Sequence, residues 1–180
     1  MVDYQTISIV FAGLSLSIAA IYYISILRIN QRNSKIALTN NIMQSMLSKQ
    51  AQRDWIELMN MVWRNYDDFE RKYGSDVDKD IFATRMSVWQ TYNLFGHLLR
   101  KNVVDAETCY IAGGNFSVFL WFKFKPILIE HAERYAGRDT YSGLEYLAEK
   151  MLELSLKNDP SYKVPEAFTK YIPNQSVSEQ

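Results

Sequence analysis

Histidine, the side chain that most often acts as a general acid or base, is rare in this sequence. Its two histidines are His97 and His131, and Glu130 stands beside the second of them. A histidine near a carboxylate can transfer protons, so these three residues are the candidates if the protein is an enzyme. Residues 130–134 lack the second histidine of a zinc-binding HExxH helix, and no serine lies in a GxSxG or SxxK pattern. We therefore identify no catalytic set and no metal site.

Two other segments contain residue types found in ligand-binding loops. Residues 76–80 carry Asp at alternate positions, as an EF-hand does, but Ile81 and Ser87 stand where that loop needs Gly and Glu. The glycine pair at 113–114 lies outside any phosphate-loop pattern. The first segment predicts a capped helix start and the second a tight turn, so we expect no calcium, phosphate or other cofactor.

The helices that would carry these residues follow one long apolar stretch, residues 7–29. No charged residue occurs between Asp3 and Arg28. A helix of this length covers roughly 35 Å, slightly more than the hydrocarbon core of a bilayer. We predict a single transmembrane helix over residues 7–29, followed by a helical stalk over residues 30–52. The N-terminus has no positive region of the kind that begins a signal peptide, so we expect an uncleaved anchor.

Charge predicts the orientation of this anchor. Arg28, Arg32 and Lys35 follow the apolar stretch, whereas Asp3 precedes it. The positive-inside rule then puts residues 1–6 outside the cell membrane and the remaining chain in the cytoplasm. Twenty cationic and twenty acidic side chains balance, which argues against nucleic acid as a partner. The single cysteine, Cys109, suits a reducing cytoplasm, and we expect it to be buried.

Beyond the stalk, apolar residues recur at helical spacing. They predict an all-α domain over residues 53–158, and the polar segment 159–180 predicts a flexible tail. No alternating β-branched run predicts a strand. The expected helices cover residues 41–73, with a break possible at 48–52, and then 81–99, 105–112, 115–135 and 142–156.

Local signals predict where several of these helices begin and end. Gly74 and Gly137 are expected stops, and Asp105 is an expected N-cap. Ser142 and Glu145 have the spacing of a capping box at the start of the last helix.

Aromatic residues are concentrated in two of the expected helices. Trp55, Met59 and Trp63 are spaced to form one continuous strip, which is typical of a core and less often of a groove for a partner helix. The most apolar helix, 115–135, contains Lys123 and Pro126. A central lysine is costly in a bilayer, so we predict a buried core helix that kinks at the proline.

Several short motifs together resemble a known family. They are TyrAsnLeuPheGlyHisLeuLeu at 92–99, ValValAsp at 103–105 and LeuGluTyrLeuAlaGluLysMet at 144–151, together with the anchor. The chain resembles a family of small prokaryotic membrane-anchored helical proteins that carry a domain of unknown function. Asn93, Trp121 and Arg134 match its recurring polar and aromatic positions, and are the candidate contact residues. Gly96 stands where an acidic residue is common in the family. The resemblance implies an architecture and no activity.

The sequence thus predicts a single-pass protein of the cell membrane with a cytoplasmic helical bundle. We expect it to act through protein contacts as a scaffold, sensor or regulatory subunit. The bilayer is its expected partner, together with another protein or a second copy of the chain. Gly13 and Ser17 have the small-residue spacing of associating membrane helices. The alternative is a membrane-surface enzyme that uses His97, His131 or Glu130.

Overall fold

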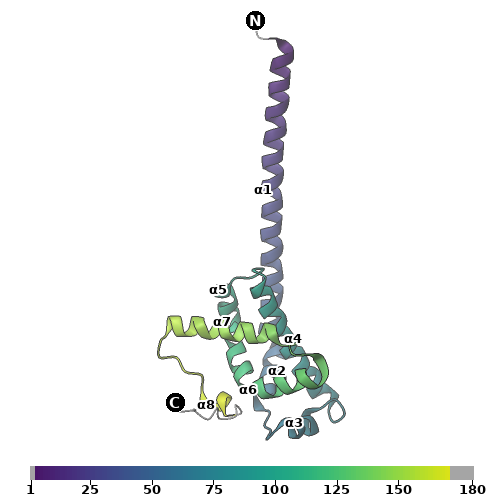
Figure 1. The fold of residues 1–180 in the computed structure, drawn as a ribbon, viewed down its shortest axis with the longest axis vertical. Coiled ribbons are helices and arrows are strands. Elements are labelled where there is room, and N and C mark those ends of the chain that lie inside the picture. Colours follow the sequence, from purple (N-terminus) through teal and green to yellow (C-terminus); the bar gives the residue numbers. More distant parts are fainter. Residues whose placement is uncertain (1–2, 171–180) are drawn as a thin grey trace. The chain divides into compact units, whose positions relative to one another are not determined.

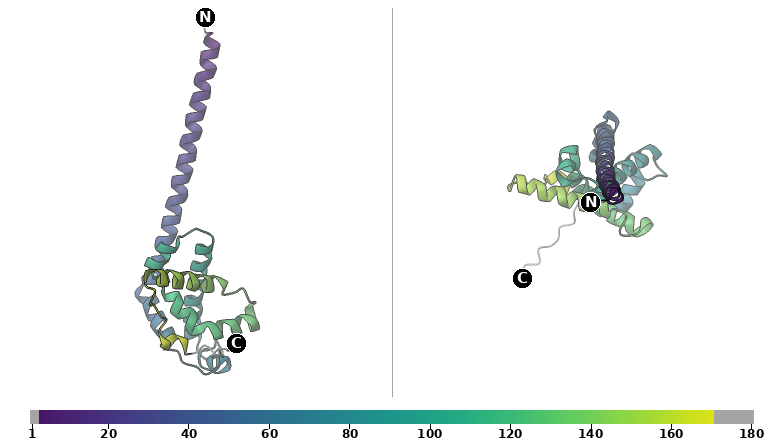
Figure 2. Two further views of the ribbon diagram at one scale, coloured as in Figure 1. Left: turned by 60° about the vertical axis from the view of Figure 1, so that its left-hand side comes forward. Right: turned by 90° about the horizontal axis from the view of Figure 1, so that it is seen from above.

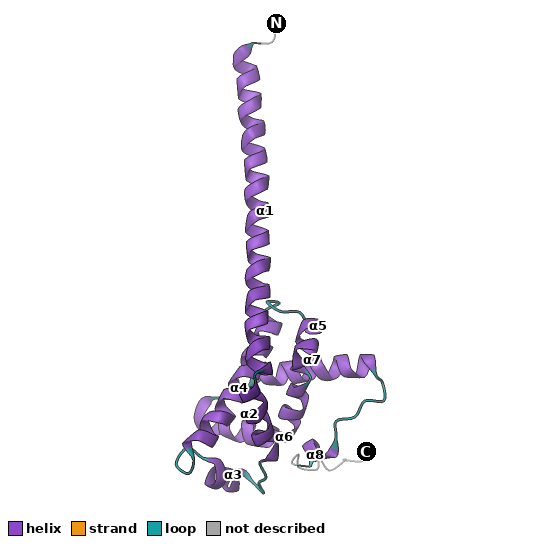
Figure 3. Cartoon of the chain, turned by 180° about the vertical axis from the view of Figure 1, so that it is seen from behind, coloured by secondary structure: helices purple, strands orange, loops and turns teal. Residues whose placement is uncertain are grey.

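The computed structural model describes residues 3–170, and that part of the chain contains helices, turns and loops without any strand (Figure 3). The predicted all-α class is confirmed. The helices are α1 (Tyr4–Leu47), α2 (Lys49–Asn60), α3 (Tyr66–Tyr73), α4 (Lys79–Arg100), α5 (Ala106–Cys109), η1 (Tyr110–Gly114), α6 (Phe116–His131), η2 (Ala132–Ala136), α7 (Ser142–Asn158) and α8 (Glu166–Thr169), of which η1 and η2 are π-helical.

The first helix, α1, continues without interruption well past the apolar stretch, as the polar but Gly- and Pro-free segment after it predicts (Figure 1). It is long and apolar enough to cross a membrane, and none of its most apolar window is buried in the structure. Contacts divide the chain into two units, Met1–Asn41 and Ile42–Gln180. The second unit, called the helical domain below, contains the last turn of α1 and all later helices.

The helix expected over residues 41–73 is divided at the possible break, 48–52, and again after α2, so one continuous helix over this range is wrong. The chain breaks at Ser48, whose Oγ accepts a hydrogen bond from the Ala51 amide at 3.1 Å and so caps α2. It breaks again between α2 and α3, where the Asn65 Oδ1 accepts from the Asp68 amide at 2.9 Å. The helical spacing of the apolar residues continues through both breaks, so periodicity alone left the first one open and did not reveal the second.

Side chains from elsewhere stabilise the break between α2 and α3. The Lys123 ammonium group donates a hydrogen bond to the carbonyl of Met59, near the end of α2. The Tyr73 hydroxyl lies 3.1 Å from the Val62 amide and accepts from it. Because α2 ends at Asn60, Trp63 cannot continue a strip along that helix, and the predicted strip is wrong. Trp63 is buried instead against Phe124, at 4.9 Å between ring centroids.

Helices α4 and α7 pack against each other more extensively than any other pair in the domain (Figure 1). Two glycines make this approach possible. A Cβ atom on Gly96 would lie 1.8 Å from the carbonyl oxygen of Gly143, and a Cβ on Gly143 would lie 2.2 Å from that of Asn93. Real Cβ atoms do not come this close to backbone, so both positions exclude any larger residue at this helix separation.

Helix α6 supplies much of the core, as predicted for the most apolar segment. Val118, Leu120, Phe124 and Leu128 are fully buried along it. The helix continues through Pro126 to His131, and the kink predicted there stays a prediction.

Several predicted helix ends and the predicted burial of Cys109 are confirmed. Asp105 caps α5 through the Thr108 amide at 2.8 Å, α3 ends at Gly74, and Gly137 ends η2 with φ 85°. Gly113 makes the tight turn before α6 with φ 88°. Cys109 is fully buried, and burial raises the pKa of its thiol to about 12.

The chain after α7 returns to the body of the domain, so that α8 lies beside α6 (Figure 2). The ring of Phe168 stacks on that of Phe119, at 4.7 Å between centroids. Helix α8 thus lies within the segment predicted to be a flexible tail. The end of that segment, residues 171–180, and the first two residues of the chain lie outside the described residues.

Candidate functional site

Asn93, the first of the three candidate contact residues, lies on α4 and joins it to the start of α7. Its Nδ2 donates to the carbonyl oxygen of Thr140 at 2.9 Å. Its Oδ1 accepts from the amides of Gly143 and Leu144, both at 3.0 Å. Those amides belong to the first turn of α7, where the backbone N–H groups have no acceptor within their own helix. Asn93 therefore caps α7 from a neighbouring helix.

The capping box predicted from Ser142 and Glu145 is wrong. The Ser142 side chain makes no capping hydrogen bond, and the residue before the first helical turn is Tyr141. A local cap is unnecessary because the Oδ1 atom of Asn93 already accepts the hydrogen bonds that a capping side chain would accept. Helix α7 thus begins where α4 provides the acceptor, and the start depends on contact between the two helices.

Trp121 is a core residue on α6, with 7% of its surface exposed. The Lys125 ammonium lies 5.5 Å from the centroid of its ring, within the range of a cation–π contact. The exposed edge of Trp121 lines a cavity of about 330 Å³ between α6, η2 and the start of α7, together with Leu128, Ile129, Ala132, Glu133, Arg138, Tyr141, Ser142 and Glu145.

Arg134 connects η2 to α3 at the surface. Its Nε donates to Glu130 at 2.8 Å, its Nη1 to Asp67 at 3.1 Å, and its guanidinium lies 4.5 Å from the centroid of the Tyr66 ring. These contacts explain the position of the Arg134 side chain without any bound ligand. No hydrogen bond, ion pair or ring contact joins any two of Asn93, Trp121 and Arg134 within residues 3–170, so the three do not form one polar site.

Each of the candidate acid–base residues also contacts other parts of the protein. The Nδ1 of His131 lies 3.0 Å from the Tyr141 hydroxyl, and its ring packs edge-to-face on Trp89. Burial lowers the pKa of His131, and the nearby Arg85 lowers it further. Glu130 pairs with Arg134. The ring of His97 packs against Gly143, whose Cβ, if present, would meet its Cδ2 at 2.9 Å.

The most deeply buried charge is one that sequence reasoning missed, Arg85 on α4. Its side chain is completely buried, and its Nη2 donates to Glu70 of α3 at 2.9 Å. Phe69, Phe82 and Trp89 surround the guanidinium, at 4.8, 4.6 and 5.3 Å from the ring centroids.

The three surrounding rings explain how a buried arginine is tolerated. Its Nε and Nη1 have no hydrogen-bond acceptor in the described part of the chain, and the faces of the three rings provide the negative potential that they meet. A signal was present in the sequence, because Arg85 lies at helical spacing between Ile81 and Trp89, on the buried face of α4. We interpret Arg85 and Glu70 as a structural pair.

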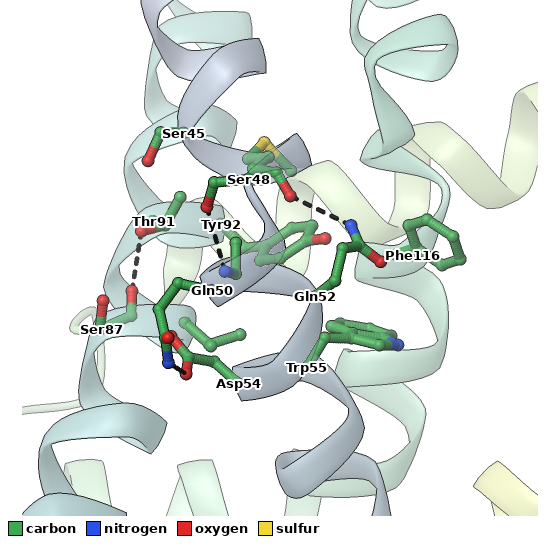
Figure 4. Close-up of a pocket in the computed structure, with 13 residues that line it drawn as sticks. Ser45, Ser48, Gln50, Gln52, Asp54, Trp55, Ser87, Thr91, Tyr92 and Phe116 are labelled. Atoms are coloured by element: carbon green, nitrogen blue, oxygen red, sulfur yellow. Dashed lines mark hydrogen bonds between the residues drawn. The ribbon is translucent and has the colours of Figure 1, made fainter.

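A second cavity, of about 150 Å³, lies between the start of α2 and the middle of α4 (Figure 4). We call it the α2–α4 cavity. Hydroxyl and amide groups line one side of it, and aromatic rings line the other. Its lining residues are Ser45, Met46, Ser48, Gln50, Ala51, Gln52, Asp54, Trp55, Ser87, Val88, Thr91, Tyr92 and Phe116.

Hydrogen bonds to the protein fix the polar side of this cavity (Figure 4). The Gln50 amide donates to Asp54 at 2.7 Å, and the Gln52 amide donates to the Met46 carbonyl at 3.2 Å. The Thr91 hydroxyl donates to the carbonyl of Ser87 at 2.8 Å. One donor of each of these three side chains is thus used within the protein, while their oxygen lone pairs stay available.

The aromatic side consists of three rings in contact. Trp55 lies 5.8 Å from Tyr92 and 5.3 Å from Phe116 between ring centroids. None of the candidate acid–base residues lines this cavity or the larger one beside Trp121. The arrangement has the ingredients of a binding site, and none of the hydroxyl groups that line it is hydrogen-bonded to Asp54 within the described residues.

The sequence offered only a faint signal for the α2–α4 cavity. Gln50 with Asp54 and Ser87 with Thr91 are polar pairs four residues apart, each next to an aromatic residue. Such pairs are common on exposed helix faces. The two pairs line one cavity only because α2 begins after Ser48 and packs on α4.

Comparison with known proteins identifies the family. A family model described as "Domain of unknown function (DUF4760)" matches residues 7–151, from the apolar part of α1 into α7. No curated protein and no solved structure matches the chain. The match includes the three motifs on which the resemblance to an uncharacterised family rested. The chain therefore belongs to this family, whose shared domain has no known function.

Proposed function

We propose that this protein spans the cell membrane once and acts by binding through a cytoplasmic helical domain. The role would be that of a scaffold, sensor or regulatory subunit. The apolar, unburied length of α1 supports the membrane span. The cluster of Arg28, Arg32 and Lys35 after the apolar stretch supports a cytoplasmic domain.

One observation carries the proposal of binding over catalysis: the three acid–base candidates named from the sequence serve as packing and pairing groups. His131 bonds to Tyr141, Glu130 pairs with Arg134, and His97 packs on α7. A general base must reach a substrate from a cavity. Both described cavities are lined by other residues, which favours a binding role.

Replacing both histidines tests this proposal against the enzyme alternative. We expect the His97→Gln, His131→Gln variant to restore a cell that lacks the protein as well as the natural chain does. Tryptophan fluorescence would show that the variant is folded. Loss of cellular function in a folded variant would overturn the proposal and favour the enzyme.

Crosslinking in native membranes tests the expected partners. A second copy of the chain is one expected product, because Gly13 and Ser17 of α1 have the small-residue spacing of associating membrane helices. Gly13→Ile should then weaken a membrane dimerisation reporter, since small residues let membrane helices approach closely. An unchanged reporter signal would exclude association through this face and favour a different protein partner.

The orientation has a separate test. The sequence AsnGlnSer at 174–176, outside the described residues, is a formal glycosylation site. In a glycosylating microsomal system, a cytoplasmic domain should leave Asn174 unmodified. A glycan there would reverse the proposed orientation.

A further inference from the structure

We propose that the α2–α4 cavity binds a small organic cation, a protonated amine attached to an apolar group about the size of benzene, with Asp54 as its counter-ion. This proposal rests on the binding role proposed above and names a ligand class for it. In that role the protein would be a sensor.

Charge is the first argument. Asp54 is the single charged side chain among the residues that line the cavity. It is half-buried, and its one hydrogen bond within the described residues comes from the neutral amide of Gln50. No cation of the described chain forms an ion pair with it. A negative charge in a partly closed space attracts a cation and disfavours an anion.

Hydrogen-bonding capacity is the second argument. The Thr91 hydroxyl has used its donor on another protein group, and the amides of Gln50 and Gln52 have each used one of their two N–H donors. Their oxygen atoms can still accept hydrogen bonds from a ligand, in addition to those of the Asp54 carboxylate. An ammonium group has three donors and no acceptor, so it can pair with the carboxylate and with these neutral oxygens at the same time.

The aromatic side is the third argument. Trp55, Tyr92 and Phe116 give the cavity an apolar surface opposite the polar one (Figure 4). Rings of this kind bind an apolar group and also attract a cation by their electron-rich faces. The ligand should therefore carry its charge at one end and an apolar body at the other.

Size limits the ligand. The volume of about 150 Å³ is close to that of an engineered protein cavity that binds benzene. Typical cavities for drug-sized ligands begin at about 300 Å³, so such ligands and folded peptide segments are too large.

Benzylamine, an aromatic ring with a protonated amine at pH 7, is the probe we choose. Benzyl alcohol has nearly the same shape and is neutral. The full chain in nanodiscs of neutral lipid would be titrated with each compound while the ¹⁵N-labelled indole resonance of Trp55 is followed. We expect benzylamine to bind at least fivefold more tightly than benzyl alcohol.

Three variants locate the charge. Asp54→Asn keeps the shape and removes the charge, so benzylamine should then bind no better than benzyl alcohol. Glu57→Gln removes an exposed charge from the same helix, outside the cavity, and should change neither affinity. Thr91→Val removes an oxygen acceptor on α4, so it should weaken the binding of benzylamine more than the binding of benzyl alcohol. This variant tests the proposal if Asp54→Asn proves unstable.

Equal affinity for the two compounds in the natural chain, or an unchanged preference in folded Asp54→Asn, would overturn the proposal. Neither result bears on His97 or His131, so failure here leaves the histidine test of the binding role intact. Conversely, a folded double-histidine variant that loses cellular function but retains benzylamine binding would contradict the non-catalytic role and leave this site in place.

Discussion

Asn93→Ala should destabilise the helical domain much more than Ser142→Ala, although Ser142 has the sequence signature of the cap. The alanine at 93 removes two accepted hydrogen bonds at the start of α7 and one donated to Thr140. Loss of a cap costs about 1–2 kcal/mol, and loss of a further buried hydrogen bond about 1 kcal/mol. We expect a total of about 3 kcal/mol.

Two further variants make the expectation specific. Asn93→Asp keeps the acceptor and places a negative charge at a helix N-terminus, worth about 0.3–1 kcal/mol, but it loses the donor to Thr140. It should cost about 1 kcal/mol in total, between the natural chain and Asn93→Ala. Ser142→Ala removes no capping bond and should cost less than about 0.5 kcal/mol.

Urea unfolding followed by tryptophan fluorescence measures these differences in the full chain in detergent. All four tryptophans lie in the helical domain, so α1 in the micelle contributes no signal. For a domain of this size, the Asn93→Ala loss corresponds to a Tm lower by roughly 10 °C. If Ser142→Ala proves the more destabilising change, α7 is capped locally and the interaction between α4 and α7 described above is wrong.

Three other expectations follow from the packing. Gly96→Ala should cost about 2–3 kcal/mol in the same assay, since its Cβ would meet a backbone oxygen that cannot move aside; a neutral result would mean that α4 and α7 lie further apart. Burial, together with the charge of Lys170, lowers the pKa of Lys123 to about 8. Between pH 8 and about 10.5 the unfolded chain therefore binds more protons than the folded chain, so the stability of the natural chain relative to Lys123→Met should rise over this range, by up to about 3 kcal/mol. A flat difference would contradict the low pKa. A fragment beginning at Ile42 should be soluble, helical by circular dichroism and cooperative on heating, and a need for detergent would contradict the independent core.

Features determined by neighbouring residues in the chain were predicted well. Asp105 caps the helix that follows it, and Gly74 and Gly137 end helices, because each acts within a few residues of its own position. The all-helical class and the family also follow from local periodicity and short motifs.

Features that depend on distant residues were not predicted. The cap of α7 comes from Asn93, fifty residues before Gly143, and the end of α2 is stabilised by Lys123, 64 residues after Met59. The α2–α4 cavity has the same origin, since its polar and aromatic sides are brought together only by the packing of four helices, α1, α2, α4 and α6. Periodicity shows which face of a helix is buried and does not show what it is buried against.

The enclosure of Arg85 has a consequence for hydrogen exchange. Helix α3 has eight residues, too few to be stable alone in water, yet its Phe69 and Glu70 form part of the surroundings of Arg85 on α4. If α3 detached, the arginine would lose its partner carboxylate and one of its three rings. The amides in the middle of α3 should therefore exchange with solvent at rates close to those of the neighbouring turns of α4, as one cooperative unit, and more slowly than its length suggests.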